Sequence, residues 1–325
     1  MTTSWPQDRP FPFSKHVPSG ELVTAWEFSQ RRISDVARVI ESLMEPTPAC
    51  VAVSGSLSRM EGHELSDLDL LIVVDDRDER EVDAEDLHRR VWRALEERLP
   101  GPEVERPTAG GIFSRCVSWK DVTDLSRRGV VDEDIDTFGH RIQLLIDSQP
   151  VTGSEQYVQL QREILDWYRE DRIRALFGES STWHWLWQDV QRYWRSLRSR
   201  SCWIASGRLG KSMEINLKLR SSRQTLVAAF LHTLDRVGMT DGCDELILEA
   251  LYRTPVERLA DASTRAAELV GAYENLWARC RELNHFNSGA HDVTPEISDA
   301  DRQIVGQLAE LTCEAIGSKS LNWIL

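Results

Sequence analysis

Long apolar runs and paired cysteines are both missing from this chain of 325 residues. No stretch approaches the roughly 18 consecutive apolar residues that a membrane-spanning helix requires. The six cysteines are scattered, with no CxxC pair and no histidine at metal-ligand spacing, so we expect reduced thiols rather than disulfides or a zinc site. The polar N-terminal segment also lacks the hydrophobic core of a secretion signal. These absences predict a cytoplasmic protein with no membrane partner.

Lysine is scarce as well, and positive charge comes almost entirely from arginine. The sequence has 5 lysines and 34 arginines, and its 39 basic residues are outnumbered by 53 acidic ones, for a net charge of −14. A field of that sign repels nucleic acids unless positive charge is concentrated in one place. Hydrophobic residues make up 41% of the chain and charged residues 28%, a composition typical of a globular protein that excludes wholesale disorder.

The spacing of apolar residues predicts a mixed first half and a helical second half. Helices are expected over residues 21–44 and 82–99, and strands over 50–53, 68–74, 104–106 and 112–119. Beyond about residue 132 the strand signals fade, and helical periodicity marks residues 134–146, 155–176, 183–203, 212–237, 241–252, 255–283 and 298–316. We therefore predict an α+β fold, with a small mixed-sheet domain over residues 1–150 and an all-helical bundle domain over residues 151–325.

A Gly-Ser turn between the first two predicted strands carries the clearest chemistry. Gly55 lets the backbone approach a ligand closely, and free N–H groups at this turn suit a phosphate, to which Ser56 adds a hydroxyl. Asp67 and Asp69 stand at the start of the second strand. Because they are two apart in an extended segment, both carboxylates point to the same side, where hard oxygen ligands suit Mg²⁺. A lone Asp-x-Asp would indicate a polar turn, but the combination favours a phosphate and metal site.

These residues resemble the signature of the polymerase-β-type nucleotidyltransferase superfamily. The signature is carried by Gly55-Ser56 and by Ser66-Asp67-Leu68-Asp69-Leu70, and the extended form with Ser58-Arg59 and Glu61 is similar to bacterial branches that modify antibiotics or proteins of nitrogen regulation. The resemblance implies transfer of a nucleoside monophosphate from a nucleoside triphosphate (NTP) to a hydroxyl, with release of pyrophosphate. It also implies Mg²⁺, or Mn²⁺, as the metal. The resemblance carries over Asp67 and Asp69 as the catalytic metal ligands, and Gly55 and Ser56 as the phosphate-binding turn. We also predict that Arg59 and Ser66 of the motif bind the nucleotide.

A third carboxylate from a later strand usually completes the site in this superfamily. Glu105 is our candidate for this catalytic, metal-binding position because it lies in the next strand-like segment, and Asp121 is second. An ordinary exposed strand residue at position 105 explains the sequence equally well. Without a third acid, a non-enzymatic module that senses nucleotides or binds a partner becomes the competing interpretation. A cofactor-free hydrolase is weaker, because no Ser/His/Asp arrangement emerges.

Arginine and tryptophan gather in the helical half. Between residues 190 and 223 there are nine basic residues and a single acid, Glu214. Such a patch would attract an NTP, with Lys218 and Arg223 as predicted ligands, but acids of neighbouring helices could equally well neutralise it. Five tryptophans between residues 183 and 203 favour core packing, although an exposed one could stack on a base. The expected acceptor is a small molecule or a protein, with an RNA end as the less favoured alternative.

Overall fold

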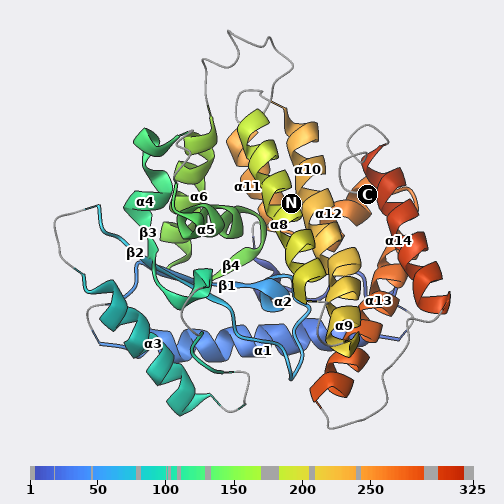
Figure 1. The fold of residues 1–325 in the computed structure, drawn as a ribbon, viewed down its shortest axis with the longest axis horizontal. Coiled ribbons are helices and arrows are strands. Elements are labelled where there is room, and N and C mark those ends of the chain that lie inside the picture. Colours follow the sequence, from blue (N-terminus) through green and yellow to red (C-terminus); the bar gives the residue numbers. More distant parts are fainter. Residues whose placement is uncertain are drawn as a thin grey trace.

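The computed structural model of the chain combines a small sheet with many helices. It describes residues 4–17, 19–44, 47–77, 82–99, 101, 104–107, 111–128, 133–169, 183–204, 209–238, 243–288 and 299–317. In Figure 1 the long helix α1 (Glu21–Glu41) passes beneath the sheet, and helices from the second half of the chain are bundled to one side. The predicted α+β class is confirmed.

The sheet has four strands in the order β3-β2-β1-β4. They are β1 (Cys50–Ser54), β2 (Leu70–Val74), β3 (Val117–Ser118) and β4 (Ser148–Thr152). β1 is antiparallel to both of its neighbours, whereas β2 and β3 are parallel. Every residue of β1 and β2 is buried, as expected for two apolar strands at the centre of a sheet. Because Val53 pairs with Leu70, the end of β1 and the start of β2 lie side by side.

The sequence accounts for the buried face of α1 and for the residue at which α3 (Ala84–Arg98) begins. In α1 the side chains of Leu22, Trp26 and Ile33 recur at helical spacing and are buried. Helix α3 begins after Asp83, whose carboxylate accepts the backbone N–H of Asp86 as an N-cap. The other helical elements of this half are α2 (Gly55–Ser58), α4 (Trp119–Thr123), α5 (Ile135–Ile146), α6 (Ser154–Tyr168) and the 3-10 turns η1 (Pro6–Asp8), η2 (Ile112–Ser114) and η3 (Leu125–Arg127).

Helices are the regular elements that the structure describes in the second half. Its elements are α8 (His184–Ile204), α9 (Leu209–Lys218), the π-helical turn η4 (Leu219–Arg223), α10 (Gln224–Val237), α11 (Cys243–Leu251), α12 (Pro255–Ala262), α13 (Ala266–Ser288) and α14 (Asp299–Ile316). The segments predicted over 134–146, 183–203, 241–252 and 298–316 match α5, α8, α11 and α14 closely, the one predicted over 212–237 spans α9, η4 and α10, and the one predicted over 255–283 is divided at Ser263 into α12 and α13. The seventh, residues 155–176, matches α6, and its last residues lie outside the described ranges.

Strand prediction was less accurate than helix prediction. Residues 104–106 have no regular secondary structure, and only Val117–Ser118 of the predicted strand over 112–119 is extended in the sheet. Strand β4 had no sequence signal, because Ser148 and Gln149 are polar and Pro150 cannot donate a backbone hydrogen bond. Its edge position explains why the proline is tolerated there.

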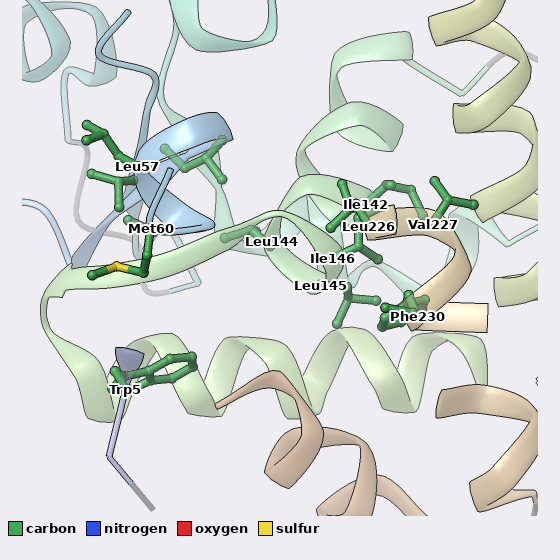
Figure 2. Close-up of a cluster of buried hydrophobic side chains, with 14 of the residues drawn as sticks. Trp5, Leu57, Met60, Ile142, Leu144, Leu145, Ile146, Leu226, Val227 and Phe230 are labelled. Atoms are coloured by element: carbon green, nitrogen blue, oxygen red, sulfur yellow. The ribbon is translucent and has the colours of Figure 1, made fainter. Parts of the chain in front are cut away.

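Buried side chains from both halves form one continuous hydrophobic cluster. Figure 2 shows part of it, where Leu57 and Met60 lie near the β4 ribbon and Leu145 lies close to Phe230 of α10. The two predicted regions therefore share a core, and the division at residue 150 stays a prediction. All six cysteines are free thiols, as expected. Within the described ranges, each helix is too short or too polar to span a bilayer.

Candidate functional site

A pocket lies between the Gly-Ser turn and the second half of the chain. One wall comes from the segment that links β1 to β2, and the other from side chains of α9, η4 and α13. Of the predicted site residues, all but Glu105 line it, namely Gly55, Ser56, Arg59, Ser66, Asp67, Asp69, Lys218 and Arg223. The structure thus brings together residues that the sequence separates by more than 160 positions.

The turn after β1 requires glycine for two reasons. Gly55 has a φ angle of +68°, in the left-handed region, and a Cβ atom at this position would lie 3.0 Å from Oδ2 of Asp69. The N–H of Ser54 donates to the backbone oxygen of Asp69 at 2.9 Å. Together the backbone bond and the close approach fix the aspartate against the turn.

The two aspartates differ in their surroundings. Asp67 is exposed and Asp69 is half-buried. Burial raises the pKa of Asp69 to about 7, and the negative charge of Asp67 adds to the effect, while Arg223 acts in the opposite direction. Negative charge at Asp69 is therefore only partly compensated by the protein.

A divalent cation fits this pair of carboxylates. Neither Asp67 nor Asp69 forms a side-chain hydrogen bond or ion pair with another residue in the described part of the chain. Both offer hard oxygen donors, and a cation would offset the charge that raises the pKa of Asp69. The residues present therefore suit Mg²⁺ or Mn²⁺.

Glu105, the predicted third carboxylate, lies elsewhere. Its side chain is exposed in a segment without regular structure that follows α3, and it is not among the residues that line the pocket. Strand β3 pairs only with Val73 and Val74, at the opposite end of β2 from Asp69. Asp121 lies beyond β3 on α4, where Ser118 caps its backbone N–H. In the described structure these segments bring no acid to the aspartate pair.

The other acids of the pocket are already paired. Glu61 and Glu214 both line it, but Glu61 accepts from Nε of Arg59 at 3.1 Å, and Glu214 accepts from Nζ of Lys218 at 2.7 Å. Arg223 is half-buried and makes no side-chain hydrogen bond or ion pair with the described residues. Three charged groups of the pocket, Asp67, Asp69 and Arg223, are thus left without a direct partner in this part of the structure.

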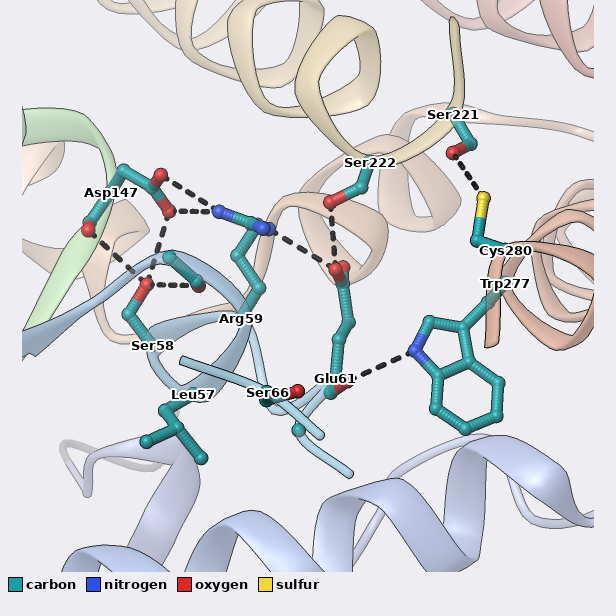
Figure 3. Close-up of polar contacts among 12 residues, drawn as sticks. Leu57, Ser58, Arg59, Glu61, Ser66, Asp147, Ser221, Ser222, Trp277 and Cys280 are labelled. Atoms are coloured by element: carbon teal, nitrogen blue, oxygen red, sulfur yellow. Dashed lines mark hydrogen bonds and ion pairs between the residues drawn. The ribbon is translucent and has the colours of Figure 1, made fainter. Parts of the chain in front are cut away.

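Arg59 is buried and holds two carboxylates. Its Nη1 donates to both oxygens of Asp147, at 2.6 and 2.7 Å, while its Nε donates to Glu61 (Figure 3). Burial lowers the pKa of Arg59, but Asp147 and then Glu61 more than offset this, so its pKa lies above the ordinary value. Ser58 adds a hydrogen bond to Asp147 at 3.0 Å. The predicted nucleotide-binding arginine is therefore held rigidly by ion pairs at the base of the pocket.

Glu61 also ties the motif to the helical half. As Figure 3 shows, its carboxylate accepts from the hydroxyl of Ser222 at 2.7 Å, and its backbone oxygen accepts from Nε1 of Trp277 at 3.0 Å. The carboxylate also accepts from the hydroxyl of Tyr273. The sequence motif includes Glu61, but it predicts neither these partners nor Asp147. No local sequence pattern predicts a contact between residues so far apart in the chain. The π-helical turn η4, which carries Ser222 and Arg223, is itself a structural indication of a functional site, because such turns often occur at functional sites.

A second group of potential metal ligands lies at the pocket edge. The ligand atoms of His63, Glu64 and His285 lie within 4.8 Å of one another. Burial lowers the pKa of His63 to about 4, so its ring is neutral near pH 7. Its Nδ1 accepts the backbone N–H of Leu65 at 3.2 Å. Nε2 in turn lies 3.5 Å from Nδ2 of Asn284, so both ring nitrogens already have a polar neighbour within the described chain.

The comparisons with known proteins agree with the geometry of the motif. Residues 21–99 match the family model described as "Putative nucleotidyltransferase DUF294". This segment belongs to the nucleotidyltransferase superfamily. The nucleotidyltransferase segment contains α1, β1, α2, β2 and α3, and with them the Gly-Ser turn and both aspartates. No curated protein and no solved structure matches the chain.

The tryptophans in and next to helix α8, outside the nucleotidyltransferase segment, are partly buried and partly exposed. Trp183 and Trp194 are buried, as core packing predicts, but Trp185 and Trp203 are 49% and 79% exposed. Four arginines of this helix are exposed, namely Arg192, Arg195, Arg198 and Arg200. Arg192 lies 4.0 Å from the ring centroid of Phe138, a cation–π contact that anchors one end of the row. The helix therefore presents a basic face next to the elements that complete the pocket.

Proposed function

We propose that this protein transfers a nucleoside monophosphate from an NTP to a hydroxyl of an acceptor, with release of pyrophosphate. The observation that carries the proposal is a set of three charged side chains beside the Gly55–Ser56 turn, Asp67, Asp69 and Arg223, which have no direct partner among the residues that the structure describes. An NTP with its cation supplies the complementary charges. The cation matches the carboxylates, and the phosphates match the arginine and the N–H groups of the turn.

The two aspartates, the Gly-Ser turn and Arg223 each have a role in this reaction. Asp67 and Asp69 would hold Mg²⁺ or Mn²⁺, which when bound supplies Lewis acidity and neutralises phosphate charge. Gly55 and Ser56 would bind the phosphate chain through backbone N–H groups and the Ser56 hydroxyl. Arg223 would neutralise the developing charge of the leaving pyrophosphate, because a cationic group placed there acts most strongly in the transition state.

The proposed chemistry forms one bond and breaks another. The acceptor oxygen bonds to the α-phosphorus, and the bond from that phosphorus to the bridging oxygen breaks, so pyrophosphate leaves and the hydroxyl proton passes to solvent. Arg59 is held by Asp147 and Glu61, so we assign it to positioning of the turn and the nucleotide. Ser66 accepts the N–H of His63 at 3.0 Å and keeps the aspartate segment close to the turn.

We favour a small molecule or a protein side chain as the acceptor, because positive charge in this acidic chain is confined to one region. A nucleic-acid end is the second candidate. The exposed arginines of α8 and the exposed ring of Trp203 favour it, since such residues bind phosphates and stack on bases.

One labelling experiment tests the activity and assigns the acceptor class. The protein is incubated with each NTP labelled at the α-phosphate, with Mg²⁺ or Mn²⁺, and with a cell extract. We expect the label to enter small molecules, protein or RNA, with stoichiometric release of pyrophosphate. For the double variant Asp67→Asn and Asp69→Asn we expect both signals to fall by about three orders of magnitude or more, because neutral amides hold the cation poorly.

Asp35→Asn is the matched control, since Asp35 pairs with Arg38 on the surface of α1 and does not line the pocket. Transfer that survives the double substitution would overturn the proposed chemistry. Metal-dependent NTP binding without transfer to any fraction would instead support the competing interpretation, a nucleotide-sensing module.

A further inference from the structure

A second, smaller cavity lies next to the candidate active site. It is bounded by the start of β4, by the loop between α11 and α12, and by side chains of α2 and α12. Its volume of about 20 Å³ is room for one or two water-sized groups. A nucleotide does not fit in that volume, which limits an occupant to a group of a few atoms.

The side chain of Arg258 from α12 lines this cavity, and within the described part of the chain no carboxylate forms an ion pair with it. It is only 7% exposed, and neither its Nε nor its Nη1 forms a hydrogen bond with any described residue. Burying a guanidinium without hydrogen bonds or a counter-ion is costly, because its hydration is lost without replacement. Burial accordingly lowers the pKa of Arg258 to about 10.

The acids closest to Arg258 are engaged with other arginines. Both oxygens of Glu257 pair with Arg9, at 2.7 and 2.9 Å, and Glu257 also accepts from the backbone N–H of Thr254 at 2.8 Å. Both oxygens of Asp147 accept from Arg59. Among the residues that line the cavity, Arg253 pairs with Asp261 instead. Arg258 is therefore left without a hydrogen-bonded carboxylate among the described residues, although Glu257 and Asp147 act on its charge through space.

We propose that this cavity binds a small oxyanion against the guanidinium of Arg258. A planar guanidinium presents its N–H groups in the geometry that carboxylate and phosphate oxygens accept. The site takes a free inorganic anion or the single anionic group of a small metabolite, and it is separate from the NTP pocket. Arg59 lines both cavities, so the occupied site would stand in contact with the residue that supports the Gly-Ser turn.

Calorimetric titration with inorganic phosphate, and separately with formate, tests this proposal on the full chain at constant ionic strength and without divalent metal. The two probes distinguish a phosphate site from a carboxylate site. For the wild type we expect saturable binding of one of them. Arg258→Met should weaken that binding by about tenfold or more, since hydrogen bonds to a charged group are lost.

Two further variants make the titration specific. Arg223→Met removes the unpaired arginine of the NTP pocket and should leave the binding intact, so anion binding at that pocket is recognised separately. Arg265→Met, an exposed arginine paired with Glu268, controls for the loss of one positive charge. Binding that Arg258→Met leaves unchanged, or that only Arg223→Met abolishes, would overturn the proposal.

Thermal unfolding tests the same site even if anion binding releases too little heat for calorimetry. In buffer without oxyanions, Arg258→Met should be at least as stable as the wild type, because an uncompensated buried charge is removed. The preferred anion should then raise the melting temperature of the wild type and not that of the variant. If Arg258→Met fails to fold, Arg258→Lys provides the same comparison. Lysine keeps the positive charge but lacks the paired N–H groups of the guanidinium. A melting temperature that rises equally in wild type and variant would contradict the site.

Discussion

At the scale of single residues, the candidate site depends on where charge is left uncompensated. Asp69 is held close to Gly55 by the backbone and by the absence of a Cβ atom. The same confinement raises its pKa to about 7. A carboxyl group with a pKa near 7 is partly protonated at neutral pH, and it becomes fully ionised when a cation binds to it.

The raised pKa of Asp69 predicts a pH dependence of stability in the metal-free protein. The unfolded chain releases this proton near the ordinary pKa of 3.8, but the folded protein holds it until about pH 7. The unfolded state thus binds fewer protons in this window, so the contribution of Asp69 to stability is complete at low pH and is lost as the pH rises from about 4 to 7. We expect a loss of about 2 kcal/mol, after discounting for partial exposure.

Urea unfolding at several pH values, compared between the wild type and Asp69→Asn, measures this contribution. The difference in unfolding free energy between the two proteins should change across this window, and Mg²⁺ should reduce that change by stabilising the ionised carboxylate. A difference that is flat with pH in the absence of metal would show that Asp69 titrates normally.

At the scale of elements, α13 and the turn η4 both donate hydrogen bonds to one side chain of the motif, that of Glu61. Glu61 receives hydrogen bonds from Tyr273, Ser222 and Arg59, and all four residues lie in the wall of the pocket. The carboxylate is buried, so each donor that is removed leaves negative charge less well solvated. This network fixes the distance between the two walls of the pocket.

Removal of the Tyr273 hydroxyl should therefore loosen both walls. For Tyr273→Phe we expect the free energy of unfolding to fall by about 1–3 kcal/mol and the KM for the NTP to rise, because Arg223 and the Gly-Ser turn are no longer held in register. Urea denaturation and steady-state kinetics measure the two effects.

Tyr252→Phe is the matched control, since no described residue receives or donates a hydrogen bond at that hydroxyl. Loss of stability with an unchanged KM would assign Glu61 and its partners a structural role alone.

At the scale of the whole molecule, the segment that matches the family model is not a complete unit. Residues 1–99 contain β1 and β2 but neither β4, which covers the other edge of β1, nor Asp147, which neutralises the buried Arg59. We expect a fragment of residues 1–99 to lack cooperative unfolding, whereas the full chain unfolds cooperatively. Circular dichroism during urea titration of both proteins checks this expectation, and a sigmoidal transition in the fragment would contradict it.

The sequence predicted local features well and distant contacts poorly. Apolar periodicity located nearly every helix, because a helix is specified by residues three and four apart. The Gly-Ser turn and the aspartates were found since they lie within one short segment. Glu105 was chosen for its place in a segment that proves not to be a strand. The contacts of Arg59 with Asp147 and of Glu61 with Tyr273 bridge 88 and 212 positions, and no local pattern encodes them.

The position of β4 also has a consequence for how the chain is made. β1 pairs with β2 nearby in the sequence, but its other edge pairs with β4, which ends at Thr152. A nascent chain on the ribosome therefore carries β1 with one open edge until residues 148–152 emerge. An apolar strand with an open edge is a place where other chains can add. Translation speed through α3, α4 and α5, and chaperones that cover exposed strands, should thus decide how much of this protein reaches its native sheet.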